Sequence, residues 1–159
     1  MPEATCVGGR LWPRLMAKPE YAVRVADVVE TLAGVPLFQG VKPKELKKLA
    51  NRMQERGFGE GDTITAEGKS GVGFFVIEDG NATVSVDGKI VRTLGPGEYF
   101  GEIALIDSGP RSATIIATTD LRCQGLTAWE FRPFIEDHPE VAWGMLETLA
   151  ARLREAEQR

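Results

Sequence analysis

Residues 100–114 read FGEIALIDSGPRSAT, and this stretch is unusual for a segment that only fills a core. Gly101 and Glu102 precede a short apolar run, and a polar loop with glycine and proline leads to Arg111. A short helix that begins near Gly101 would present free N–H groups, which suit an anion. The stretch therefore indicates a ligand with both hydroxyl groups and a negative charge. On spacing alone, a structural salt bridge between Glu102 and Arg111 is an equally good interpretation.

The segments on both sides of this stretch, from residue 57 to residue 126, are typical of short β-strands separated by turns. Asp87-Gly88 is a strong hairpin signal, since both residues tolerate positive φ. Many short strands at close spacing favour a small antiparallel sandwich or a jelly-roll barrel (β-roll). The fold is therefore expected to be mainly β with flanking helices, with strands at residues 63–65, 73–80, 82–86, 89–94, 112–118 and 121–126.

Helical periodicity precedes the strands. Apolar residues at helical spacing predict one helix over residues 20–33 and a second over 43–52. The organisation that we expect is a disordered leader (1–18), an N-terminal helical segment (19–53), a β-roll (54–126) and two C-terminal helices (127–159).

Two further helices are predicted after the strands. Thr127 and Glu130 have the spacing of a capping box, and His138-Pro139 should end the helix that they begin. The last helix, over residues 141–156, carries a stripe of Ala142, Met145, Leu146, Leu149 and Leu153. Such a stripe suits a core or the seam of a homodimer.

The composition narrows the possible partners. The chain has 159 residues and a net charge of −4, and clustered Lys and Arg are needed to bind nucleic acid, so we expect no nucleic-acid partner. No apolar run approaches the roughly 20 residues of a membrane span, so no membrane partner is expected. Two cysteines cannot form a disulfide framework, and a cytoplasmic setting is expected. Met1 and Met16 are both candidate start residues.

Catalytic sites in small β-barrels need side chains that this chain lacks. A metal centre inside a barrel of the cupin type requires several histidines and carboxylates that project inward. The chain has a single histidine, His138, which is placed at a helix end beside a proline. A catalytic triad of nucleophile, histidine and carboxylate is not expected either, because His138 is the one histidine and lies outside the predicted barrel. We therefore expect no catalytic residues, no metal, no cofactor and no enzymatic activity.

Once residues 100–114 are placed between two strands of a β-roll, the pattern resembles the cyclic nucleotide-binding domain. This is the domain of catabolite activator proteins, protein kinase A regulatory subunits and nucleotide-gated channels. The resemblance covers about residues 28–154 and is most specific in the phosphate-binding cassette, FGEIAL followed by PRSAT. GFFVIEDGNATV (73–84) and LGPGEYFGE (94–102) support it.

The resemblance implies a role for individual residues. Arg111 would pair with the cyclic phosphate, Glu102 would accept from the ribose 2′-hydroxyl, and Gly101 would let the backbone approach the ribose. Backbone amides of Ala104 and Ser112 would face the sugar-phosphate, and the Ser112 hydroxyl would add a donor unless Ser112 is only a strand residue. The ligand-binding set implied is Gly101, Glu102, Ile103, Ala104, Arg111, Ser112 and Ala113.

The purine is expected against the β-roll wall, under a residue from a helical segment. Val72, Val84 and Val86 are candidates for the wall, although each could be plain core. The candidates for the lid are Trp143, Met145 and Leu146. The alternative for these three is a place in a core or a dimer seam, to which a helical apolar stripe often belongs.

These expectations describe a stand-alone sensor that binds cAMP and moves its C-terminal helices in response. Ser112 follows the arginine where cGMP-preferring family members often have threonine, which favours cAMP, although a cGMP-preferring sensor stays open. The alternative from another class is a structural or interaction module that keeps the fold without nucleotide affinity. Expected partners are the cyclic nucleotide and either a second copy of the chain or a separate effector protein.

Overall fold

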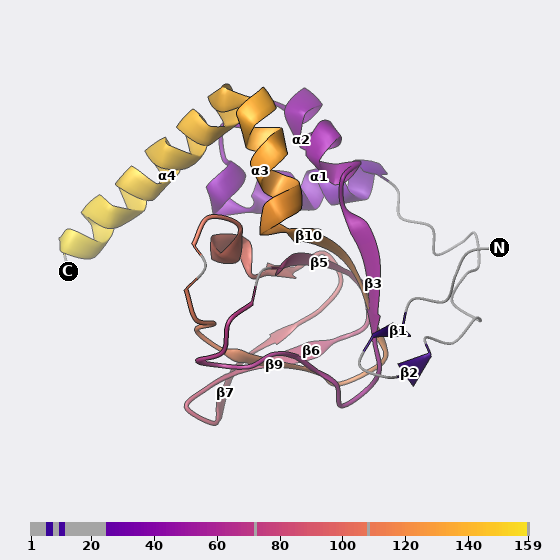
Figure 1. The fold of residues 1–159 in the computed structure, drawn as a ribbon. Helices are drawn as coiled ribbons and strands as arrows, with labels where there is room; N and C mark the ends of the chain where they lie inside the picture. Colours follow the sequence, from indigo (N-terminus) through magenta and orange to yellow (C-terminus); the bar gives the residue numbers. More distant parts are fainter. Residues whose placement is uncertain (1–5, 8–9, 12–24, 72, 108, 159) are drawn as a thin grey trace.

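The segments rich in strand formers fold into two four-stranded antiparallel sheets. The computed structural model describes residues 6–7, 10–11, 25–71, 73–107 and 109–158. The sheets have the orders β3-β10-β5-β8 and β4-β9-β6-β7, and they pack face to face without closing into a barrel (Figure 1). Their strands are β3 (Gln54–Phe58), β4 (Thr63–Thr65), β5 (Gly73–Asp79), β6 (Ala82–Val86), β7 (Lys89–Leu94), β8 (Tyr99–Phe100), β9 (Thr114–Ala117) and β10 (Leu121–Thr127).

The expected hairpin at Asp87-Gly88 is confirmed. Asp87 has φ 50° and Gly88 has φ 74°, which is the pair of positive φ values that a tight turn of the primed type requires. The turn joins β6 to β7 with Val86 opposite Lys89. The backbone N–H of Asp87 also donates to Glu67 Oε2 over 2.9 Å, which ties the hairpin to the loop after β4.

Strand β5 is apolar from Gly73 to Ile77, where both of its faces are buried or half-buried, and it ends on Glu78 and Asp79. Phe74 and Val76 point to the helices, whereas Ile77 and the half-buried Phe75 point into the space between the sheets. The period of two in a strand explains this division. The inter-sheet core also contains Cys123 of β10, which is fully buried.

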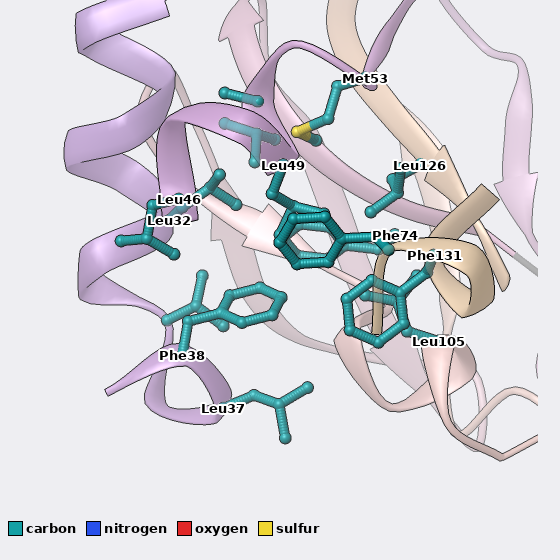
Figure 2. Packing of buried hydrophobic residues seen from close by; sticks show 14 of the residues in the cluster. Leu32, Leu37, Phe38, Leu46, Leu49, Met53, Phe74, Leu105, Leu126 and Phe131 are labelled. Carbon is teal, nitrogen blue, oxygen red and sulfur yellow. The ribbon is translucent and has the colours of Figure 1, made fainter. Parts of the chain in front are cut away.

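The helices cover the outer face of β5 and form the larger core. Phe74 is fully buried and contacts Phe38 edge to face, with ring centroids 6.0 Å apart. Leu105, from the segment that follows β8, enters the same core beside Phe131 (Figure 2). The surrounding elements are α1 (Val25–Gly34), the 3₁₀ turn η3 (Pro36–Phe38), α2 (Pro43–Ala50), α3 (Ala128–Asp137) and α4 (Pro139–Glu157).

The capping box at the start of α3 is also confirmed. The backbone N–H of Glu130 donates to Thr127 Oγ1 over 3.3 Å, and the backbone N–H of Thr127 donates to Glu130 Oε2 over 2.8 Å. These reciprocal bonds satisfy two donors at the point where β10 turns into α3.

Replacement of Thr127 by alanine is expected to lower the free energy of unfolding by about 1 kcal/mol, because Ala cannot accept from the Glu130 amide. Thr127→Ser keeps the acceptor and should stay close to the parent protein. Urea denaturation followed by circular dichroism measures both variants. Equal losses in the two would show that packing of the threonine methyl group, and not the cap, stabilises this junction.

Several boundaries differ from the sequence-based expectation. Strands β3 and β8 were not among the predicted strands, and β9 is shorter than residues 112–118. On α4, Met145 is buried and Leu149 is partly buried, whereas Leu146 and Leu153 are exposed. The end of α4 extends away from the helical core (Figure 1), and two of the five residues of the predicted stripe are exposed.

Most of the leader lies outside the described residues. Within it, Cys6–Val7 (β1) and Arg10–Leu11 (β2) pair as two short antiparallel strands. Across the part of the chain that the structure describes, every helix is too short or too polar to cross a membrane.

Candidate functional site

The two ends of the stretch, residues 100–102 and 111–113, form one side of a cavity of about 360 Å³. This volume lies within the range of small-molecule sites, which is about 300–1,000 Å³. One sheet supplies the wall, the end of β8 and the following turn supply the rim, and α4 closes one side with a single side chain. The lining residues are Thr65, Val84, Arg92, Tyr99, Phe100, Gly101, Glu102, Arg111, Ser112, Ala113, Ile115 and Arg152.

A left-handed glycine starts the turn that carries Glu102. Gly101 has φ 83° and directly precedes the 3₁₀ turn η4 (Glu102–Leu105). A Cβ at this position would collide with the carbonyl oxygen of Gly73 and with Arg111 Nη1. Leu105, at the other end of η4, is anchored in the helical core. The turn is therefore fixed between the cavity and the helices, and only glycine fits at its start.

The guanidinium of Arg111 is held by backbone and has no acidic partner among the described residues. Its Nη2 donates to the carbonyl oxygen of Gly73 over 2.7 Å, and a Cβ at Gly71 would collide with its Nε. Nε is buried and has no hydrogen-bond partner among the described residues. Burial lowers the pKa of Arg111, because desolvation disfavours the charged form.

Glu102 and Arg111 both line the cavity, and no ion pair joins them in the described part of the chain. The interpretation of these two residues as a structural salt bridge is therefore not supported. Burial of a charge without a counter-charge costs free energy, because the charge loses its hydration. An anion that binds beside the charge offsets this cost. Arg111 is in this situation in part, because its side chain is half-buried and its Nε is buried without a hydrogen bond in the described structure.

The other charges in the cavity make it positive overall. Arg92 of β7 and Arg152 of α4 add two cations to Arg111, against the single carboxylate of Glu102. Desolvation raises the pKa of Tyr99, with a further rise from Glu102 that Arg152 and Arg92 oppose. Tyr99 therefore stays a neutral phenol that can donate a hydrogen bond at neutral pH.

The structure brings most of the predicted ligand-binding residues to this cavity. Gly101, Glu102, Arg111, Ser112 and Ala113 line it. Ile103 is 43% exposed, and neither Ile103 nor Ala104 belongs to the lining.

Of the described candidates for the wall and the lid, only Val84 lines the cavity. Val84 lines the cavity, Val86 does not, and Val72 lies outside the described residues. Trp143 and Leu146 are exposed on α4, and Met145 is buried in the helical core. None of these three α4 residues lines the cavity.

Arg152 is the α4 residue that reaches the cavity, and sequence reasoning did not identify it. Its position depends on how α4 is oriented after His138, which local patterns do not specify. Tyr99 and Arg92 were also missed. Tyr99 had a signal, because it lies two residues before Gly101 in the quoted motif.

Comparison with known proteins assigns the family. The model of the cyclic nucleotide-binding domain matches residues 55–138, which is more than half of the chain. The chain belongs to the cyclic nucleotide-binding domain family, as its cassette indicated.

Among curated relatives, the chain is similar to a CRP-like cAMP-activated global transcriptional regulator of Mycobacterium tuberculosis. The two are 33% identical over 130 residues, which cover 79% of this chain and 58% of the relative. A cAMP-dependent protein kinase regulatory subunit of Colletotrichum orbiculare is 39% identical over 97 residues, which cover 60% of this chain and 25% of the subunit. The chain therefore spans little more than half of the one relative and a quarter of the other.

Among solved structures, the N-terminal domain of a transcriptional regulator from Streptomyces coelicolor has a similar fold. The TM-score is 0.72 at 32% identity, and the match covers 80% of this chain and 92% of that domain. The agreement of fold and family confirms a mainly β domain with flanking helices.

Proposed function

We propose that this chain is a regulatory module that binds cAMP in the cavity between η4 and the β4-β9-β6-β7 sheet. The observation that carries the proposal is the guanidinium of Arg111, which lines the cavity, is held by Gly73 and has no carboxylate partner in the described chain. A cyclic phosphate diester carries one permanent negative charge and would supply the missing counter-charge.

The remaining lining residues suit the other parts of the ligand. Glu102, on η4, lines the cavity, and its carboxylate would accept from the ribose 2′-hydroxyl. Ser112 is next to Arg111 and would add a hydroxyl donor for the phosphate. Val84 offers an apolar wall for the purine, and Arg152 would cover the base from the side of α4.

The preference for cAMP over cGMP rests on two observations. The position after Arg111 is serine. The names of two relatives, a transcriptional regulator and a kinase regulatory subunit, both refer to cAMP. What these two relatives regulate is a property of the full-length relatives. For this chain, the candidate partners are a separate effector protein and a second copy of the chain.

The proposed response runs through Leu105. This residue ends η4, which begins at the cavity with Glu102, and it is buried in the same core as Phe131 of α3 and Met145 of α4. Inward movement of η4 on phosphate binding would therefore shift the packing of both C-terminal helices. The ligand can change this equilibrium only by its difference in affinity between the two helix arrangements.

Isothermal titration with cAMP, cGMP and 5′-AMP tests the binding step. We expect saturable binding of cAMP, weaker binding of cGMP and the weakest binding of 5′-AMP, whose open phosphate carries more charge and a different shape. Absence of binding to both cyclic nucleotides at tens of micromolar would support the alternative of an interaction module without nucleotide affinity. Hydrogen exchange of α3 and α4, with and without cAMP, tests the helix movement separately.

Arg152→Ala is expected to weaken cAMP binding about two- to thirtyfold, because a cation over an aromatic face contributes about 0.5–2 kcal/mol. Arg154→Ala removes an exposed arginine from the same helix outside the cavity lining and is the matched control. Titration of both variants measures the difference. Equal affinities for the two variants would exclude Arg152 as the lid.

A further inference from the structure

A second cluster of polar side chains lies in the helical layer, where α2 meets the junction of α3 and α4. His138 separates the two C-terminal helices, and its Nδ1 lies 2.9 Å from Glu45 Oε2 of α2 and 3.4 Å from Glu140 Oε1 of α4. One ligand atom from each of the three residues falls within 4.8 Å of the other two. The cluster is outside the nucleotide cavity and has no part in the function proposed above.

The donor set is one that a transition metal accepts. Imidazole nitrogen and carboxylate oxygens bind Zn²⁺, and three protein ligands with water in the remaining position form a common zinc arrangement. At Zn–N and Zn–O distances near 2.0–2.1 Å, tetrahedral ligands lie about 3.3 Å apart. The two distances from Nδ1, 2.9 and 3.4 Å, bracket this value, and the two carboxylates lie within 4.8 Å of each other and would have to close onto the ion.

The burial of Glu45 provides the independent observation. Glu45 is 8% exposed, and its Oε2 is buried. His138 Nδ1 at 2.9 Å and Lys48 Nζ at 3.3 Å lie close to Oε2, but no described donor makes an aligned hydrogen bond to it, and Lys48 donates to Oε1 instead. A buried carboxylate oxygen that lacks an aligned donor is costly. A cation between Oε2 and Nδ1 would satisfy both atoms.

Other groups around the cluster define what competes with an ion. Lys48 Nζ lies 3.3 Å from Glu45 Oε2, but the Lys48 side chain is 43% exposed and can turn into solvent. The Arg52 guanidinium lies 3.9 Å from Asp137 Oδ2. The ring of Phe134 packs against the imidazole with centroids 4.8 Å apart, which fixes its orientation.

We propose that Glu45, His138 and Glu140 form a binding site for one divalent transition-metal ion, with Zn²⁺ as the fitting ion. The site links α2 to the first turn of α4 and would fasten the junction between the two C-terminal helices. The expectation that the chain holds no metal was based on the interior of the strands, and this cluster lies in the helical layer.

The test is a titration of the full chain with Zn²⁺ at pH 7.5, followed by isothermal calorimetry and by NMR of the imidazole ring. His138 is the chain's one histidine, so its ring signals report this site without ambiguity. We expect one saturable Zn²⁺ per chain and a matching change of the His138 ring signals. Glu140→Gln, whose side chain is 57% exposed and tolerant of change, should weaken binding at least about tenfold.

Two further variants sharpen the test. Lys48→Met removes the competing ammonium and should tighten Zn²⁺ binding, whereas Glu136→Gln, an exposed carboxylate of α3 outside the cluster, should leave affinity unchanged. Zn²⁺ bound elsewhere, for example at Cys6, would leave the His138 ring signals unmoved and would overturn the proposal. Absence of binding, or equal affinities of Glu140→Gln and Glu136→Gln, would overturn it as well.

Discussion

Replacement of Arg111 by glutamine is expected to weaken the binding of cAMP about ten- to a hundredfold or more. Hydrogen bonds to a charged group contribute about 1.5–3 kcal/mol each, and a factor of ten corresponds to about 1.4 kcal/mol. Glutamine keeps a polar amide in place of the guanidinium, whose Nη2 donates to the Gly73 carbonyl oxygen over 2.7 Å, but it carries no charge for the phosphate. Isothermal titration measures the change in Kd.

Two controls separate loss of charge from loss of fold. Arg111→Lys keeps the charge without the planar set of donors, so its affinity should lie between those of Arg111→Gln and the parent protein. Thermal unfolding of the ligand-free variants should show little destabilisation, because Arg111 is half-buried and its charge has no counter-charge among the described residues. Unchanged affinity in Arg111→Gln would remove the main support for the proposed function.

The largest expected effect on stability is that of Phe74→Ala. Phe74 is fully buried between β5 and the helices, and it contacts Phe38 and the Tyr99 ring, whose centroid is 6.3 Å away. Removal of a buried phenyl ring leaves a cavity and costs about 3–5 kcal/mol. Urea denaturation should show this loss, and Val91→Ala, at a position that is 61% exposed, should change stability by less than about 0.5 kcal/mol.

The same variant should also affect the cavity. Phe74 follows Gly73, whose carbonyl oxygen holds Arg111, and it packs against Tyr99, which lines the cavity. Affinity for cAMP measured well below the unfolding transition is therefore expected to fall as well. A large loss of stability with unchanged affinity would show that the Arg111 position does not depend on this core.

Sequence patterns predicted those parts of the fold that depend on interactions between residues close together in the chain. The hairpin at Asp87-Gly88 follows from two residues that accept positive φ, and the cap at Thr127 follows from a side chain that reaches three residues along the helix. Strand β8 was missed because two residues are too few to show a period, although its Phe100 is buried.

The candidate site was predictable where its residues are contiguous and unpredictable where they are distant. Gly101, Glu102 and Arg111 lie in one motif, and all three line the cavity. Arg152 is far along the chain, and its place depends on the direction that α4 takes after Pro139. The apolar period of α4 favoured Leu146 instead, because a stripe indicates a buried face only where another element covers it.

The burial of Cys123 has a practical consequence for labelling chemistry. Its thiol is fully buried in the inter-sheet core, and desolvation, with a further contribution from the charge of Glu78, raises its pKa strongly. Thiol reagents attack the thiolate, so Cys123 stays protonated and unreactive at the neutral to mildly alkaline pH of maleimide coupling. Cys6 is then the one natural cysteine to replace before probes are attached to α4, and the inter-sheet core can be left untouched.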